Sequence, residues 1–140
     1  MKESLQNSCS MLLFILASVS NAMQPTELFD YAIEMNKNIA SSGDKYQVIA
    51  RNIIGIAYYS ALLLASDFLS QPTTGQDGHA NITRNLQKKN SLIGNALNKA
   101  RLLRHKADYQ LKETFTSKDI AAQLTDCGKV LNYIKSEQSK

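Results

Sequence analysis

The segment that decides the fold is residues 48–69, which read VIARNIIGIAYYSALLLASDFL. As a helix this segment is apolar on nearly every side, so it must be surrounded by other helices or lie in an interface. The charged Arg51 and Asp67 bracket the apolar run, which argues against a membrane span. Tyr58 and Tyr59 interrupt it and need partners for their hydroxyl groups if they are buried. We expect the central helix of a bundle, with both tyrosines in the core or at an interface.

Four further helices are predicted around this segment, because apolar positions recur there at helical spacing. Asp44 is the expected N-cap of the central helix, and the turn-forming residues 71–78 separate it from the next one. The sequence therefore predicts an all-α protein, an up-and-down four-helix bundle with an extra short helix. In chain order, the expected helices span residues 26–40, 44–69, 79–88, 91–110 and 117–136.

The length of 140 residues fits one domain, and its residue types point away from a metal centre. Cys9 and Cys127 cannot make a disulfide framework, and Cys127 falls in an apolar helical stripe, where a thiol acts as a small hydrophobe. His79 and His105 are the only histidines, and no CxxC motif is present. We expect neither a metal site nor a cofactor, because too few ligands are available.

Residues 1–22 have the outline of a secretory signal peptide. Lys2 precedes an apolar run at residues 11–19, which is too short to span a bilayer, and Ser20-Asn21-Ala22 follows it. The alternative is that Met23 is the true start and the upstream residues come from a misplaced start codon. In both interpretations the domain comprises residues 23–140. A start at Met23 predicts a cytoplasmic protein, and a true signal predicts an exported one.

Positive charge is concentrated in one part of the chain. Residues 84–112 hold eight Lys and Arg residues against one acid and carry a net charge of +7, whereas residues 23–83 carry −3. Charge segregated in this way attracts anionic partners such as RNA or a nucleotide, although a solvated helix face would look the same. The predicted nucleic-acid or nucleotide-binding residues are Arg84, Lys88, Lys89, Lys99, Arg101, Arg104 and Lys106.

The fourth predicted helix carries a cluster of polar side chains. Arg104 projects into the apolar arc, and Asp108 lies one turn later, so these two residues should form an ion pair. Arg101 and His105 are also neighbours at i and i+4, and Tyr109 follows His105 by one turn. An arginine can hold a phosphate while a histidine moves a proton, so Arg101, His105 and Tyr109 are candidate catalytic residues. The alternative is an ion-paired helix edge at a bundle or dimer interface.

His79 follows the loop and opens the third predicted helix. At that place we expect a surface or capping residue rather than a catalytic one.

Several segments, in this order and spacing, resemble the HEPN domain, a small helical bundle found in prokaryotic toxin–antitoxin and defence modules. The resemblance covers about residues 24–134. The segments that carry it are Ala57-Tyr58-Tyr59, Gly78-His79, Arg104 through Ala107-Asp108-Tyr109, and Phe115-Thr116. The resemblance implies a homodimer, a small nucleotidyltransferase encoded nearby as antitoxin, and RNA or a nucleotide as ligand.

The chain departs from the pattern of active HEPN ribonucleases, in which four to six residues separate an arginine from a histidine. Here Arg101 and His105 have three residues between them, and Ile56 and Leu63 stand where relatives with the Ala-Tyr-Tyr segment often have arginine and histidine. We therefore expect a HEPN-type binding module without a complete ribonuclease motif. The alternatives are a metal-independent endoribonuclease toxin that uses Arg101 and His105, and an exported helical protein of unrelated function.

Overall fold

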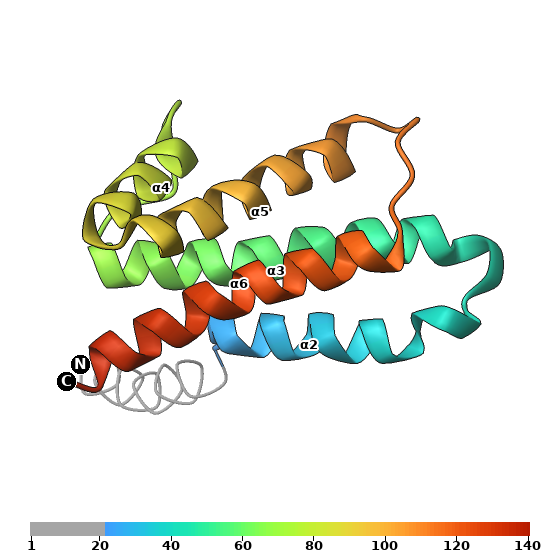
Figure 1. Ribbon diagram of the computed structural model, residues 1–140, viewed down its shortest axis with the longest axis horizontal. Helices are drawn as coiled ribbons and strands as arrows, with labels where there is room; N and C mark the ends of the chain where they lie inside the picture. Colours follow the sequence, from blue (N-terminus) through green and yellow to red (C-terminus); the bar gives the residue numbers. More distant parts are fainter. Residues whose placement is uncertain (1–21) are drawn as a thin grey trace, which may run out of the picture.

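The structure, a computed structural model, describes residues 22–140. Within this range it is all-α, without strands, and its helices pack against one another (Figure 1). The helices are α2 (Pro25–Asn38), α3 (Tyr46–Leu69), α4 (Gly78–Lys89), α5 (Ser91–Tyr109) and α6 (Ser117–Gln138), with two 3₁₀ turns, η1 (Ile39–Ser41) and η2 (Gly43–Lys45). The predicted all-α class with five helices is confirmed. The apolar run at residues 11–19 and Cys9 lie outside the described residues.

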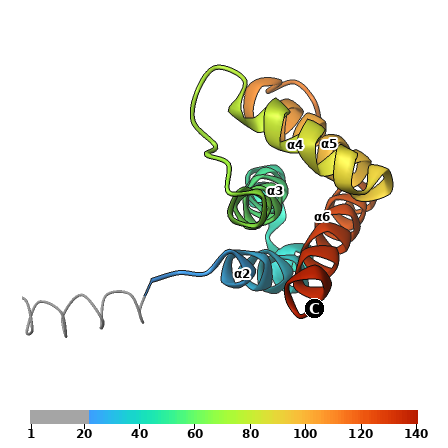
Figure 2. The same cartoon turned by 90° about the vertical axis from the view of Figure 1, so that its left-hand side faces the viewer.

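Helix α3 is the central element, as its composition predicts. It packs against α2, α6, α5 and α4, while α4 packs mainly on α5. Seen along the bundle, α2 lies on one side of α3 and the α4–α5 pair on the other, and α6 lies between them, packed on α3 and α5 (Figure 2). The core consists of apolar side chains that face these contacts, and its largest members are Tyr58, Ile53, Ile54, Leu62, Ile82, Leu86, Leu97, Ile120 and Ile134. Cys127 is also buried there, and burial raises the pKa of its thiol.

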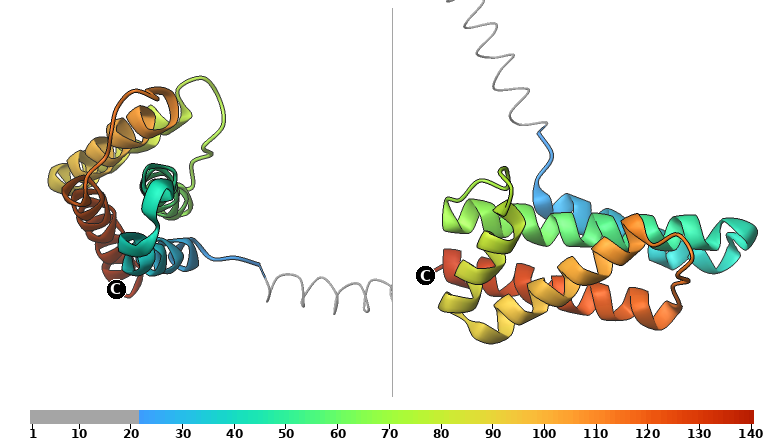
Figure 3. Two further views of the ribbon diagram at one scale, coloured as in Figure 1. Left: turned by 90° about the vertical axis from the view of Figure 1, so that its right-hand side faces the viewer. Right: turned by 90° about the horizontal axis from the view of Figure 1, so that it is seen from above.

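One side of α3 is not covered by another described helix (Figure 3). Its apolar side chains remain accessible, with exposed fractions of 61% for Val48, 37% for Tyr59 and 36% for Leu63. Together with the turn before it, this helix (Gly43–Leu69) is long and apolar enough to cross a membrane by length and composition, with 56% of the apolar window buried in the fold. Core helices of soluble proteins meet the same criterion.

The N-terminal end of α3 begins differently from the prediction. Asp44 does not cap the helix, because it lies within η2, and the N-cap position is taken by Lys45 without a side-chain hydrogen bond. The reason is the backbone at Gly43, whose φ of +62° is a left-handed conformation that glycine adopts without strain. The chain therefore turns once more before α3 starts at Tyr46.

Arg51 joins the start of α3 to the connection between α5 and α6. Its guanidinium donates hydrogen bonds to four backbone carbonyl oxygens, those of Ala107, Gln110, Leu111 and Glu113, at distances between 2.6 and 3.2 Å. The same group lies 5.0 Å from the centre of the Phe115 ring. Gln47 adds a pair of hydrogen bonds to the backbone N–H and carbonyl of Phe115. These contacts satisfy carbonyl groups that the end of α5 leaves without helical partners.

Gln123 of α6 connects α3 and α5 inside the core. Its side chain is 1% exposed, and its Nε2 donates to the carbonyl oxygens of Ile54 at 2.9 Å and Ala100 at 3.1 Å. A buried amide is stabilising only where its polar atoms are paired, and here the pairing links three helices.

Candidate functional site

A pocket of about 330 Å³ lies between the loop before α4, the first turn of α4 and the middle of α5. This volume is at the lower end of the range of roughly 300–1,000 Å³ found for small-molecule sites. The lining residues are Thr73, Gly75, Gln76, Asp77, His79, Ala80, Arg101 and Arg104. We call it the arginine–histidine pocket.

The wall of the pocket on the α4 side depends on a close approach of backbone to backbone. A Cβ atom at Gly78 would lie 2.3 Å from the carbonyl oxygen of Thr73, so only glycine fits at this position. The N–H of Gly78 donates to the carbonyl of Gly75 at 3.3 Å, which holds the loop against the start of the helix. Asp77 occupies the N-cap position but makes no side-chain capping hydrogen bond. The positive end of the α4 dipole therefore faces the pocket without a cap.

His79 is fixed by Tyr58, which reaches it from α3. The hydroxyl Oη of Tyr58 lies 3.1 Å from Nδ1 of His79, and the Tyr58 side chain is fully buried. Burial raises the pKa of Tyr58, so its hydroxyl stays protonated. Burial, followed by the charges of Arg104 and Arg101, lowers the pKa of His79, so its imidazole is neutral at pH 7. The sequence analysis expected the Tyr58 hydroxyl to need a partner if buried. That partner is His79, which was predicted to be a surface or capping residue.

Arg104 lies over both tyrosines. Its guanidinium carbon is 5.2 Å from the centre of the Tyr58 ring and 5.5 Å from that of Tyr59, and Nη1 donates to the Asp108 carboxylate at 2.9 Å. The predicted Arg104–Asp108 ion pair is therefore present, with the Arg104 side chain only 11% exposed. Two aromatic faces and a carboxylate compensate for removing the charge from water.

Both arginines of the pocket have donor groups that the fold does not use. Arg101 donates through Nη2 to the Asn98 side chain at 2.9 Å. The Nε atoms of Arg101 and Arg104 are buried and have no hydrogen-bond partner among the described residues. A buried donor without a partner costs free energy, so the fold holds both arginines in place at an energetic cost.

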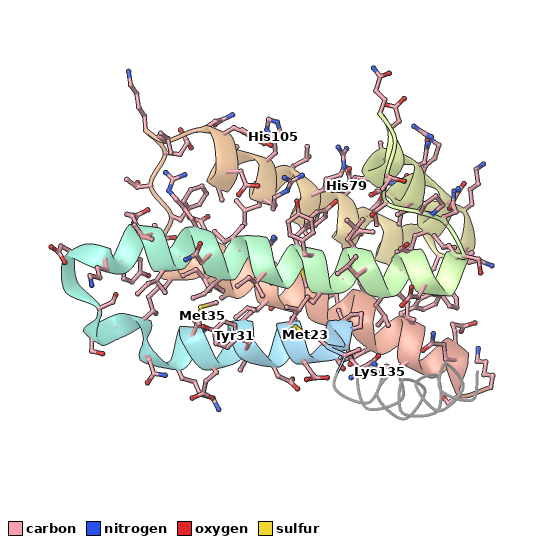
Figure 4. The ribbon with its side chains drawn as sticks, turned by 180° about the vertical axis from the view of Figure 1, so that it is seen from behind. Met23, Tyr31, Met35, His79, His105 and Lys135 are labelled. Atoms are coloured by element: carbon pink, nitrogen blue, oxygen red, sulfur yellow. The ribbon has the colours of Figure 1, made fainter. Side chains whose placement is uncertain are left out.

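The predicted catalytic group is divided by the structure. Arg101 lines the pocket, whereas His105 is exposed and Tyr109 is 67% exposed. The two rings contact each other, with centres 4.8 Å apart and an interplanar angle of 47°. Figure 4 shows His79 and His105 on separate elements, His79 at the start of α4 and His105 near the end of α5. Within residues 22–140 no hydrogen bond joins Arg101 to His105, and the catalytic role of Arg101, His105 and Tyr109 stays a prediction.

The seven predicted binding residues do not all line one pocket, and their role in binding stays a prediction. Arg101 and Arg104 line the pocket, while Lys99 and Lys106 line a shallow groove elsewhere on α5 with Leu102 and Leu103. On α4, Arg84 donates to the Asn81 side chain, Lys89 lies 5.7 Å from the Phe68 ring centre, and Lys88 is exposed.

His79 and the Tyr58 hydroxyl are the groups to which the sequence assigned no part in a binding or catalytic site. The sequence feature that could have identified His79 is its place directly after Gly78, at the end of a turn-rich loop. There the side chain lies beside the N-terminus of a helix.

Comparisons with protein-family models, curated proteins and solved structures find no match for this chain. Among the described residues, no group of three or more His, Cys, Asp or Glu side chains is placed to hold a metal ion. The geometry of the arginine–histidine pocket is therefore the main structural indication of what the chain binds.

Proposed function

We propose that this chain is a HEPN-type helical module of a prokaryotic toxin–antitoxin or defence system, acting in the cytoplasm, and that it binds the phosphate of a nucleotide or RNA. The proposal is supported by the order of the five helices, four of which pack around the long apolar α3, with Tyr58 and Tyr59 in the middle of α3. It is also supported by the net charge of +7 on residues 84–112, which include α5. Binding, rather than ribonuclease activity through His105, is the function that the geometry favours.

The observation that carries the proposal is that two arginines, Arg101 and Arg104, line one pocket. Guanidinium groups match phosphate oxygens because their N–H groups form a planar fork. The lining holds two arginines and one acid, Asp77, and Asp108 outside the lining pairs with Arg104, so these four side chains carry no net charge. An anion in the pocket would therefore be held by guanidinium hydrogen bonds rather than by an excess of positive charge.

Binding to a labelled single-stranded RNA and to ATP, followed by fluorescence anisotropy over a range of salt concentrations, tests this function. We expect affinity to fall steeply with salt, and Arg101→Ala to reduce the slope of log K against log salt by about 0.7. Lys129→Ala is the matched control, because it removes one positive charge at an exposed position of α6, outside the arginine–histidine pocket. Absent binding, or binding that salt and Arg101→Ala leave unchanged, would contradict the proposal.

The proposed module pairs with a second copy through the uncovered side of α3 and with a small nucleotidyltransferase. Val48, Tyr59 and Leu63 give this side an apolar surface that a second copy would bury. Light scattering coupled to gel filtration should show a dimer that Leu63→Lys converts to a monomer. A monomer at all concentrations in the parent protein would remove the dimer from the proposal.

A further inference from the structure

The hydrogen bond between Tyr58 and His79 determines which edge of the imidazole faces the pocket. Tyr58 is fully buried, and Nδ1 of His79 is the acceptor within reach of its hydroxyl hydrogen. If the hydroxyl accepted from Nδ1 instead, its own hydrogen would be buried without a partner, at a cost in free energy. The hydroxyl therefore donates, and the proton of the neutral ring is on Nε2. Because Nε2 lies on the ring edge away from Tyr58, His79 presents a donor rather than a base.

Donors from two helices converge on the same space. α5 contributes the guanidinium groups of Arg101 and Arg104, and α4 contributes Nε2–H of His79. The first turn of α4 adds the backbone N–H groups of His79 and Ala80, for which the described residues provide no hydrogen-bond partner. An uncapped helix N-terminus beside two arginines is a site for a strongly charged anion.

Building on the proposed function, we propose that the arginine–histidine pocket binds the terminal phosphate of a phosphate monoester of nucleotide size, with Arg101, Arg104 and Nε2–H of His79 as donors and Tyr58 as the positioning residue. A phosphate monoester carries about −1.5 to −2 charges at pH 7 and three terminal oxygens. An internal phosphodiester of RNA has one charge and two such oxygens, fewer than the donors that converge here. The ligand is therefore a nucleoside monophosphate or the 5′-phosphate end of an RNA.

Isothermal titration calorimetry of the full chain distinguishes these ligands. The probes are AMP, adenosine, and one RNA hexamer prepared with either a 5′-phosphate or a 5′-hydroxyl. Because charge-assisted hydrogen bonds are lost without the phosphate, we expect AMP to bind at least about tenfold more tightly than adenosine. Tighter binding of the phosphorylated hexamer than of AMP identifies an RNA end as the ligand, and the reverse identifies the free nucleotide. Equal affinities for AMP and adenosine, together with equal affinities for the two hexamers, overturn the proposal.

Three variants test the donor on His79 and its positioning by Tyr58. His79→Gln keeps an amide donor and should retain AMP binding better than His79→Ala. Tyr58→Phe keeps the ring under Arg104 but loses the hydroxyl, so AMP affinity should fall several-fold while thermal stability changes little. Nitrogen-15 NMR of the histidines should show Nε2–H for His79 in the parent protein and a tautomer mixture in Tyr58→Phe.

Lys129→Ala is again the charge-matched control and should bind AMP as the parent does. If His79→Gln and His79→Ala bind AMP equally, or if Tyr58→Phe keeps both the parent affinity and the Nε2–H signal, the proposed roles of His79 and Tyr58 are wrong.

The outcomes separate this inference from the proposed function. RNA binding that depends on salt and Arg101 but ignores the terminal phosphate refutes the monoester site and leaves the RNA-binding module in place. No binding of any of these probes refutes both.

Discussion

Two regions of this bundle place arginine between α3 and α5, and they use it in opposite ways. Near one end, Arg51 directs its donors to four backbone carbonyls and lies against the Phe115 ring. In the arginine–histidine pocket, Arg101 and Arg104 keep buried Nε donors without a partner. An arginine that donates four hydrogen bonds to the backbone is part of the scaffold, whereas one whose guanidinium lines a cavity is available to a ligand. The comparison predicts stability effects at Arg51 and binding effects at the pocket.

The largest expected effect is on stability at Arg51. Arg51→Met removes the partner of four carbonyl groups while keeping an apolar stem against Phe115, so we expect a loss of about 2–4 kcal/mol in the free energy of unfolding. Urea denaturation followed by circular dichroism measures this loss. The folded variant should bind AMP and RNA as the parent does. A loss below about 0.5 kcal/mol, which is typical of surface substitutions, would contradict the structural role of Arg51.

The next effect concerns two glycines that differ in their surroundings. Gly78→Ala places a Cβ 2.3 Å from the Thr73 carbonyl oxygen, so we expect destabilisation of about 1–3 kcal/mol and weaker binding in the pocket. Gly55→Ala meets no atom within 4 Å and is the matched control. In mid-helix it should stabilise the protein by up to about 1 kcal/mol, because alanine favours a helix more than glycine does. Equal effects at the two positions, measured by thermal and urea unfolding, would mean that the loop does not contact α4 as described.

A smaller effect is the dependence of stability on pH that His79 contributes. Its pKa in the folded state lies below the ordinary value of 6.5 because of burial and the nearby Arg104 and Arg101. As the pH falls below about 6.5 the unfolded chain therefore takes up the proton first, and stability decreases. The contribution is complete above pH 6.5 and is lost as the pH falls through the folded-state pKa. The free energy of unfolding at pH 7.5 and 5.5 should differ less in His79→Gln than in the parent, and an unchanged difference would contradict the buried environment of this histidine.

The smallest expected effect on binding is at His105, which lies outside the pocket and contacts the exposed Tyr109 ring. His105→Ala should change RNA affinity less than twofold. The same variant also tests the ribonuclease alternative, because that alternative requires His105. If the parent cleaves RNA or arrests bacterial growth and His105→Ala abolishes that effect, the chemistry belongs to Arg101 and His105, and the pocket is not the active centre.

The helices were predictable because their signal is local. Apolar residues at helical spacing located all five within a few residues at each end, and the only position for the 48–69 segment was the centre. The true start of α3 was not predictable, and the expected cap at Asp44 was wrong. The left-handed backbone at Gly43 inserts a 3₁₀ turn that residue spacing alone does not reveal. The Arg104–Asp108 pair was predictable because both residues share one helix face.

The pocket itself was only half predictable. Arg101 and Arg104 stand out by charge, but the place of His79 depends on α3 and α4 meeting, and 21 residues separate it from Tyr58. Local sequence patterning shows Arg51 only as the charged residue at one end of an apolar run, because its hydrogen-bond partners lie 56 to 62 residues further along the chain. Contacts at such separations follow from the tertiary fold, which local periodicity does not specify.

The amide of Gln123 has a consequence for ligand recognition at a site it does not touch. The two carbonyls that accept from it, those of Ile54 and Ala100, each lie four residues before a residue of the site, Tyr58 on α3 and Arg104 on α5. By linking both helices to α6, this side chain helps to fix the distance between the Tyr58 ring and the guanidinium that lies over it. The position of α6 therefore affects the geometry of a pocket that α6 does not line.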